Sequence, residues 1–318
     1  MSNLLFIISQ PRSGSTLLQA ILSNNKKVNT ASEPWILLPF ISFENPEIQR
    51  GIYNSSLATS GIQDYVKNVG GNHDLVKESL QTFFKNVYSP LDSKDIEYIL
   101  DKTPRYYEIL PLIIEYFPEA KIIVLKRNPL DVIQSIITTW DVKNYHHLAN
   151  YSRDILNGPF LIQKFLDENN SNPNIIEVFY ENLTIEPEKE IKRLYSWLGL
   201  EFTEEVLNYK NNNKVTGLMG DKKGFIQKGK IIDVKSHVEW SKFWNVFFVG
   251  YLDFLGERFL MRYGNYKFNI KLHPTTEFND FKFAERLNYF NNNELKITNL
   301  LKLIFYKIKS KFKSEYKI

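Results

Sequence analysis

The first hydrophobic run of the chain ends in a polar loop, and a helix-like pattern follows it. Residues 4–8 are all apolar, a short continuous run typical of a strand buried on both faces of a sheet. Leu17, Leu18, Ile21 and Leu22 then recur at the spacing of one helix face. The loop between the two patterns contains one glycine and one cation. The chain is therefore predicted to begin with a strand, a polar loop and a helix.

Similar apolar runs recur along the chain and alternate with amphipathic stretches. We expect further strands at 28–33, 98–100, 121–125 and 175–180. We expect helices at 62–87 (broken at 70–72), 106–117, 151–166, 187–198 and 240–263. The segment 35–62 is rich in Pro, Gly, Asn and Ser and is predicted to be a loop. The alternation predicts an α/β protein with three layers, in which helices flank a central, mainly parallel sheet.

The loop after the first strand has the composition of an anion site. A strand that turns into a helix leaves backbone N–H groups free, and these bind anions together with the helix dipole. Around Gly14, Arg12 adds a cation, and Ser13, Ser15 and Thr16 add hydroxyl donors. A Walker A loop carries a lysine where Ser15 stands, so this cradle lacks that lysine. The alternative is an ordinary turn between a strand and a helix.

Polar residues also follow the other predicted strands, at the edge where parallel sheets bind ligands. Glu33 follows the second strand and is a candidate acid or base; its alternative is a helix-capping or solvated carboxylate. Lys102 follows the third strand. Arg127 follows the fourth, and Ser135 lies about two helical turns further on, so both can converge on one phosphate. The alternative for that pair is an internal Arg–carboxylate pair with a core serine.

Composition narrows the class of protein. The chain has 318 residues, of which 43% are hydrophobic, enough for a large core. It has no cysteine and only 5 histidines, without metal-binding spacing, which argues against thiolate chemistry and a histidine-based metal site. The net charge of +4 suits a polyanionic ligand and is too small to indicate nucleic acid. Without a membrane-length apolar stretch or a signal-peptide pattern, we expect a cytoplasmic protein.

The composition changes near the C-terminus. We expect one domain over 1–265 and a basic helical extension over 266–318. Residues 295–318 place lysines around Leu, Ile and Phe in the pattern of a basic amphipathic helix. One interpretation is peripheral contact with the inner membrane surface, and the other is docking on the chain's own domain. The oligomeric state is not indicated.

Several of these stretches resemble one family. Residues 11–18 (PRSGSTLL) are similar to the 5′-phosphosulfate loop of the sulfotransferase family. Residues 127–135 (RNPLDVIQS) resemble its 3′-phosphate motif, and 179–183 (FYENL) resemble a third block. Lys102-Thr103-Pro104 resembles a fourth. The resemblance extends over about 3–265.

The resemblance implies a P-loop-like fold and a nucleotide sulfuryl donor. The donor would be 3′-phosphoadenosine 5′-phosphosulfate (PAPS), the product adenosine 3′,5′-bisphosphate (PAP), and no metal would be needed. Residues from Arg12 to Thr16 would hold the 5′-phosphosulfate, Arg127 and Ser135 the 3′-phosphate, and Tyr180 would face the adenine. The family also often has a basic, glycine-rich block near the C-terminus. Residues 220–224 match that block only loosely, so we assign no site residue there.

The resemblance also indicates where the base lies. Cytosolic members carry a catalytic histidine two residues after the lysine, but Pro104 stands there. The protein-tyrosine and bacterial glycolipid branches use a glutamate shortly after the first helix, which matches Glu33. In this reading Glu33 is the general base, and Arg12 and Lys102 stabilise charge on the transferring group. Segments 35–62 and 215–232 would exclude water.

The acceptor is left open by the sequence. A glycan, a glycolipid or other lipid-linked sugar, a peptide tyrosine and a small alcohol remain candidates, and aromatic residues such as Trp35 and Phe40 suit sugar stacking. Two other classes also remain. One is a P-loop kinase that uses ATP, and the other is a non-catalytic nucleotide-binding scaffold.

Overall fold

The computed structural model describes residues 2–41, 54–71, 73–208, 250–252, 254–264 and 266. These residues fall into two compact units. The first contains the described residues of 2–127 and 158–208, and the second contains 128–157 and the described residues from 250 onward. The 215–232 loop and the basic stretch 295–318 lie outside the described residues, as do residues 42–53 of the predicted 35–62 loop and residues 240–249 and 253 of the predicted 240–263 helix.

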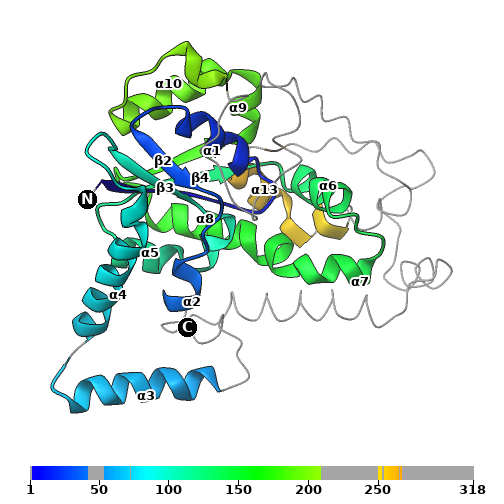
Figure 1. The fold of residues 1–318 in the computed structure, drawn as a ribbon. Helices are drawn as coiled ribbons and strands as arrows, with labels where there is room; N and C mark the ends of the chain where they lie inside the picture. The colour runs from blue at the N-terminus through cyan, green and yellow to red at the C-terminus, as the bar shows by residue number, and fades with distance from the viewer. Residues whose placement is uncertain are drawn as a thin grey trace, which may run out of the picture. The chain divides into compact units, whose positions relative to one another are not determined.

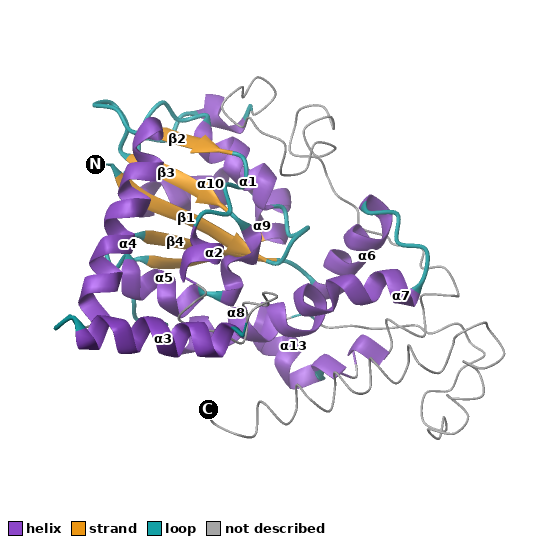
Figure 2. Ribbon diagram, turned by 60° about the horizontal axis from the view of Figure 1, so that its bottom comes forward, coloured by secondary structure: helices purple, strands orange, loops and turns teal. Residues whose placement is uncertain are grey.

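A five-stranded sheet forms the centre of the first unit, and all its pairings are parallel. Its order is β2-β3-β1-β4-β5. Figure 1 shows the sheet among its helices, and Figure 2 shows β2, β3, β1 and β4 in this order. The strands are β1 (Asn3–Ser9), β2 (Val28–Ala31), β3 (Tyr98–Lys102), β4 (Lys121–Lys126) and β5 (Ile175–Phe179). The central position of β1 places the loop that follows it beside the carboxyl ends of β3 and β4. The predicted α/β fold with a parallel sheet is confirmed.

Helices bury both faces of this sheet. Leu5 and Ile7 belong to a hydrophobic cluster with one set of helices, namely α1 (Ser15–Ser23), α9 (Tyr180–Ile185) and α10 (Pro187–Leu198). Phe6 points the other way, and its ring packs against Tyr106 and Phe117. On that face lie α4 (His73–Tyr88), α5 (Leu110–Tyr116) and α8 (Gly158–Glu168). Burial of alternate residues on both faces explains the unbroken apolar run of β1.

The expected loop over 35–62 is partly wrong. The helix α2 (Leu37–Ile41) lies within it, and α3 (Ser55–Asn68) begins well before residue 62. Asn54 starts α3 because its side chain accepts a hydrogen bond from the Leu57 N–H at 3.0 Å, an N-cap that we did not recognise. The predicted break at 70–72 is confirmed between α3 and α4.

Two predicted helices are divided in the structure. The stretch 106–117 consists of a 3₁₀ helix, η3 (Pro104–Glu108), followed by α5. The stretch 151–166 starts with the last residue of a 3₁₀ turn, η4 (Ala149–Tyr151), passes through a π-helical segment, η5 (Arg153–Asn157), and continues as α8. By contrast, α10 has the expected bounds and ends at Gly199, whose φ is +74°. Shorter 3₁₀ turns are η2 (Ser89–Leu91) and η6 (Glu204–Leu207).

The second unit packs helices around its own apolar cluster. It contains α6 (Pro129–Thr139), α7 (Tyr145–Leu148), η4 (Ala149–Tyr151) and α13 (Glu257–Gly264). Asn128 caps α6 by accepting a hydrogen bond from Leu130 N–H at 3.0 Å. Within this unit Tyr251 OH donates to the carbonyl of Ile155 at 2.7 Å. None of the helices that the structure describes is long and apolar enough to span a membrane.

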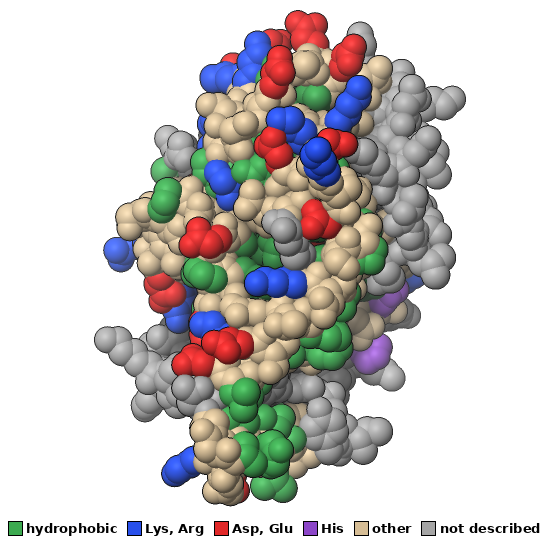
Figure 3. Space-filling view, turned by 60° about the vertical axis from the view of Figure 1, so that its left-hand side comes forward, with side chains coloured by type: hydrophobic (Ala, Val, Ile, Leu, Met, Phe, Trp, Pro, Cys, Tyr) green, Lys and Arg blue, Asp and Glu red, His purple; other side chains and the backbone are tan. Residues whose placement is uncertain are grey.

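The surface of the first unit mixes charges of both signs with one apolar region. Figure 3 shows hydrophobic side chains gathered at the lower end of this face, where α3 lies in Figure 1. On α3, Leu57 and Tyr65 are 70% and 66% exposed. This helix therefore leaves large apolar side chains at the surface.

Candidate active site

The loop between β1 and α1 turns through two left-handed residues. Arg12 has a φ of +70° and Gly14 a φ of +91°, and Gly14 is the N-cap of α1 without a side-chain cap. The first N–H groups of α1 have no partner within the helix. The hydroxyl of Ser13 is fully buried and has no hydrogen-bond partner among the described residues. Such a group costs about 1–3 kcal/mol unless a ligand pairs with it, so the loop fits an anion.

Tyr180 and Arg127 pack against this loop. Tyr180 begins α9 at the carboxyl end of β5, and a Cβ built on Gly14 would lie 2.3 Å from its ring. The Arg127 guanidinium lies 4.3 Å from the centroid of the same ring, a cation–π contact. Its Nη1 donates to the Arg12 carbonyl at 2.9 Å, and its Nε is buried without a partner in the described structure. Four predicted site residues, Arg12, Gly14, Arg127 and Tyr180, thus meet where β1, β4 and β5 end.

Lys102 links this loop to the candidate base. It ends β3, is 1% exposed, and its Nζ lies 2.7 Å from Glu33 Oε1 and 3.2 Å from Thr16 Oγ1. A lysine from a neighbouring strand therefore reaches the loop, although the loop has no lysine of its own. Trp35 Nε1 donates to the other carboxylate oxygen of Glu33 at 3.3 Å. Two donors thus orient a carboxylate whose side chain is 15% exposed.

For two predicted site residues, Ser15 and Ser135, the structure gives a position in the fold that does not by itself test their predicted role. Ser15 is buried and begins α1. Ser135 is half-buried on α6 in the second unit, so its pairing with Arg127 on one phosphate stays a prediction. Contact of Tyr180 with adenine likewise stays a prediction. No group of three or more His, Asp or Glu side chains that could hold a metal occurs among the described residues.

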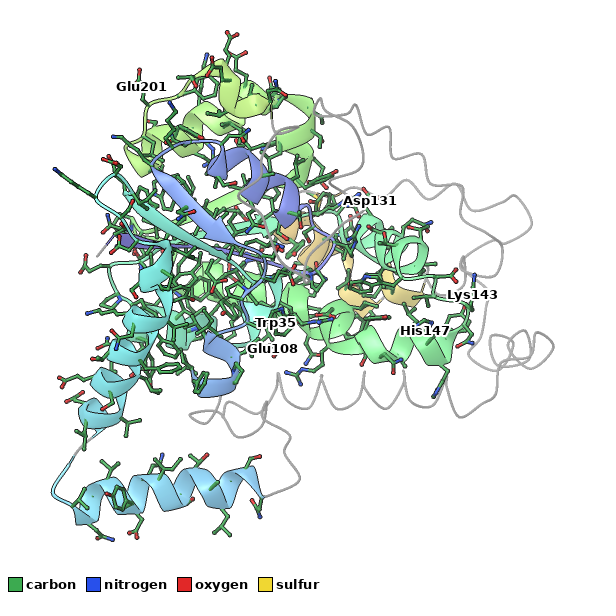
Figure 4. The ribbon with its side chains drawn as sticks, in the orientation of Figure 1. Trp35, Glu108, Asp131, Lys143, His147 and Glu201 are labelled. Carbon is green, nitrogen blue, oxygen red and sulfur yellow. The ribbon has the colours of Figure 1, made fainter. Side chains whose placement is uncertain are left out.

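From the sequence we missed Asp101 and did not predict the contact of Trp35 with Glu33. Trp35, labelled in Figure 4 just before α2, has a φ of +56°, and Arg105 lies 5.6 Å from its ring centroid. Asp101 is buried on the face of β3 opposite Lys102, and burial raises its pKa to about 6. In the sequence, the signal for Asp101 was an acidic residue directly before Lys102. The predicted strand ended at residue 100, and only a strand that includes both residues points their side chains to opposite faces.

The close approach of Tyr180 to Gly14 yields a prediction. Gly14→Ala adds a methyl group where a φ of +91° and a 2.3 Å contact both oppose it. We expect a loss of stability of more than about 1–2 kcal/mol, the cost of the left-handed backbone alone. We also expect weaker binding of inorganic pyrophosphate, because the loop backbone that carries the N–H donors must shift away from the Tyr180 ring. Thermal unfolding and isothermal titration calorimetry measure the two effects.

Gly199 provides the matched control for this prediction. Its φ is +74°, but nothing lies within 4 Å of an added Cβ. Gly199→Ala should therefore show the backbone cost without loss of anion binding. Equal behaviour of the two variants would contradict a role for the Gly14–Tyr180 contact in the anion site.

The comparisons with known proteins agree on one family. The sulfotransferase family profile matches residues 5–204. Nodulation protein NoeE of Sinorhizobium fredii is 31% identical over 138 residues, which are 43% of this chain and 32% of that protein. Protein-tyrosine sulfotransferase 1 of Danio rerio is 22% identical over 213 residues, 65% of this chain and 56% of that protein. The chain thus spans about a third to just over half of these two relatives.

A solved structure of the sulfotransferase domain from the curacin biosynthetic pathway is 22% identical, with a TM-score of 0.49. That alignment covers 73% of this chain and 88% of the other. The assignment rests on the family match, which spans more than half of the chain. The match includes Glu33, Lys102, Arg127, Tyr180 and residues 12–16, which we call the anion loop. On that match, the chain belongs to the sulfotransferase family.

Proposed function

We propose that this protein transfers a sulfuryl group from PAPS to an acceptor hydroxyl or amine, with Glu33 as the general base. The observation that supports this best is the position of Lys102 Nζ, 2.7 Å from Glu33 Oε1 and 3.2 Å from Thr16 Oγ1. One buried cation thereby connects the anion loop with a carboxylate that can accept a proton. Membership of the sulfotransferase family supports sulfuryl transfer over an ATP-dependent kinase reaction.

The residues of the loop fit the phosphate end of such a donor. The free N–H groups at the start of α1, the unpaired Ser13 hydroxyl and the Thr16 hydroxyl would hold the 5′-phosphosulfate. Arg127 has a buried, unpaired Nε that would donate to the 3′-phosphate. We propose Ser135 as a second ligand of that phosphate and Tyr180 as the contact of the adenine.

PAPS supplies a sulfuryl group attached to a phosphate leaving group. Glu33 accepts the proton of the acceptor while the acceptor oxygen or nitrogen bonds to sulfur and the bond from sulfur to the phosphate oxygen breaks. A positioned general base is typically worth about 10²–10⁴-fold in rate. Lys102, Arg12 and the loop amides stabilise the negative charge that develops on the sulfuryl oxygens and the leaving phosphate. These residues place cationic charge where many enzymes use a metal.

The acceptor that we propose is a hydroxyl-bearing glycan, glycolipid or small metabolite. The name of the Danio rerio relative specifies protein tyrosine, which is also a hydroxyl acceptor. Trp35 donates to Glu33, so one aromatic surface suited to stacking on a sugar lies beside the proposed base. Phe40 on α2 is 44% exposed and packs against Phe83 of α4. Our proposals for the compartment (cytoplasm), for a domain over 1–265 and for peripheral membrane contact through 295–318 rest on the sequence.

A transfer assay tests the function directly. The full chain is incubated with ³⁵S-labelled PAPS and a mixed acceptor extract, and labelled products are separated and identified. We expect labelled product that is absent with Glu33→Gln. PAP binding without transfer to any acceptor would instead favour a nucleotide-binding scaffold. Magnesium-dependent ATP binding with no preference for a 3′-phosphate would favour a kinase.

The 3′-phosphate site yields a prediction of its own. Arg127→Ala removes a charge-assisted contact worth about 1.5–3 kcal/mol, so PAP affinity should fall roughly 10–100-fold. Binding of adenosine 5′-monophosphate should fall much less, because it has no 3′-phosphate. Calorimetric Kd values for both nucleotides measure the difference. The control is Arg193→Ala, which removes an arginine that pairs with Glu190 on α10. Equal losses for both nucleotides with Arg127→Ala would contradict the assignment.

A further inference from the structure

A buried carboxylate lies on the face of β3 opposite Lys102. Asp101 is 1% exposed and accepts three hydroxyl hydrogen bonds. Tyr88 OH and Tyr106 OH lie 2.5 and 3.1 Å from Oδ2, and Thr103 Oγ1 lies 2.8 Å from Oδ1. An ionised carboxylate only accepts hydrogen bonds, so all three hydroxyls direct their single proton toward it.

Two of these hydroxyls also hold the chain just after Glu33. Tyr106 OH accepts a hydrogen bond from the Leu37 N–H at 3.0 Å, and Thr103 Oγ1 accepts one from the Trp35 N–H at 3.4 Å. Because each hydroxyl has already donated its proton to Asp101, its lone pairs are available for these amides. Asp101 therefore sets the direction of two hydrogen bonds that end on residues 35 and 37.

Trp35 needs such an anchor. Its φ of +56° is a left-handed conformation that bulky L-residues rarely adopt, and it costs on the order of 1–3 kcal/mol unless surrounding contacts hold it. In this conformation its indole Nε1 lies 3.3 Å from Glu33 Oε2. The backbone anchors at residues 35 and 37 thus determine where the indole donor meets the carboxylate.

We propose that Asp101 is a positioning residue that orients Glu33 through Thr103, Tyr106 and the left-handed Trp35. The assignment rests on the proposed function, in which Glu33 accepts the acceptor's proton. Asp101 touches no reacting atom. It acts by fixing the direction of a carboxylate that must point at the acceptor, where a misplacement of about 1 Å can cost about 10²-fold in rate.

We call the two hydrogen-bond chains that start at Asp101 relays: one runs through Thr103 to the Trp35 N–H, and the other through Tyr106 to the Leu37 N–H. The charge of Asp101 determines whether both relays keep their direction. A protonated carboxyl group donates from one oxygen, so at least one of the hydroxyls from Tyr88, Thr103 and Tyr106 must turn around. Burial raises the pKa of Asp101 to about 6, although the three hydroxyls and the neighbouring Lys102 charge lower it. We therefore expect the positioning to weaken as the pH falls through about 6.

The same protonation has the opposite effect on global stability. The pKa of Asp101 is about 6 in the folded chain, against its ordinary value of 3.8. Between these values the folded state binds the proton more readily, so the contribution of Asp101 to the free energy of unfolding rises as the pH falls. Loss of turnover below pH 6 that came from Asp101 would therefore not be accompanied by a loss of stability from this group.

The first test compares two buried tyrosines that donate to the same carboxylate. Tyr106→Phe removes a relay to Leu37, whereas Tyr88→Phe removes only a donor from α4 that makes no hydrogen bond to 34–37 in the described structure. We expect Tyr106→Phe and Asp101→Asn to lower kcat about 10–100-fold with PAP affinity nearly unchanged. Tyr88→Phe should stay within about threefold of the parent at pH 8. Equal kcat losses for the two tyrosine variants would overturn the proposal.

The second test needs no enzymatic activity. The ¹⁵N-labelled full chain gives an indole N–H resonance for Trp35, which is assigned by its loss in Trp35→Phe. We expect this resonance to titrate with a midpoint near pH 6 in the parent and to lose that titration in Asp101→Asn or Tyr106→Phe. A resonance that does not respond to pH in the parent would overturn the relay. Failure of sulfuryl transfer alone would refute the proposed function and leave this measurement valid.

Discussion

Glu33→Gln should lower kcat by about 10²–10⁴-fold, the range expected when a general base is removed. The amide keeps the shape of the side chain and an oxygen that can still accept from Trp35 Nε1, but it cannot take a proton. PAP affinity should stay close to that of the parent, because Glu33 bonds to Lys102 and Trp35 rather than to the loop backbone. Steady-state kinetics with PAPS and calorimetry with PAP separate the two effects.

Glu97→Gln is the matched control for this variant. Glu97 forms a Lys–Glu pair with Lys27 at the surface, where both side chains are about half exposed. Its replacement removes a carboxylate and a lysine partner without touching the loop, so turnover should not change. If Glu33→Gln retained the parent kcat, Glu33 would be a structural partner of Lys102 and another group would have to be the base.

Lys102→Met should lower kcat by about 10²–10³-fold, similar to the loss of one preorganised donor in other active sites. Methionine has nearly the same length and apolar character as the lysine stem, so it fills the buried site without the charge. PAP binding should weaken as well, because Lys102 Nζ lies 3.2 Å from the Thr16 hydroxyl of the anion loop. Kinetics and calorimetry, with thermal unfolding to confirm folding, measure these effects.

Lys126→Met is the control for the loss of a buried lysine charge away from the anion loop. Lys126 is also 1% exposed, pairs with Glu177 and bonds to Gln163 at 2.9 Å, but it faces α8 rather than α1. Burial lowers its pKa, as expected for a charge taken out of water. Lys126→Met should alter stability and leave turnover largely intact. Equal losses of turnover for the two lysine variants would mean that a buried lysine charge, rather than contact with the loop, is what matters.

The order of the elements could be predicted from the sequence because burial on both faces of a sheet makes apolar runs continuous. β1, β4, β5 and α10 have almost the predicted bounds. The elements that differ depend on local polar contacts, such as the Asn54 cap that starts α3. Such a contact is visible in the sequence only as one of many asparagines in a polar segment.

Much of the site was also predictable, since strand ends in a parallel sheet lie at a common edge. Arg12, Glu33, Lys102 and Arg127 were chosen for their place after a predicted strand, and Tyr180 was chosen from the family resemblance. Hydrogen bonds or ring contacts join these residues around the loop. Their partners were not predictable. Which lysine atom reaches which carboxylate depends on side-chain directions that a strand reverses at every residue.

The sequence alone determined the strand–loop–helix order around the candidate anion site, the α/β architecture and the family, because each is recorded in short stretches of consecutive residues. Only the tertiary structure revealed that Lys102 bridges Glu33 and Thr16, and that the two hydroxyls which accept from the Trp35 and Leu37 N–H groups donate to Asp101. These contacts join residues 102–106, at the end of β3 and just after it, to residues 68 to 86 positions earlier in the chain. Their geometry exists only after parallel strands have brought those segments together.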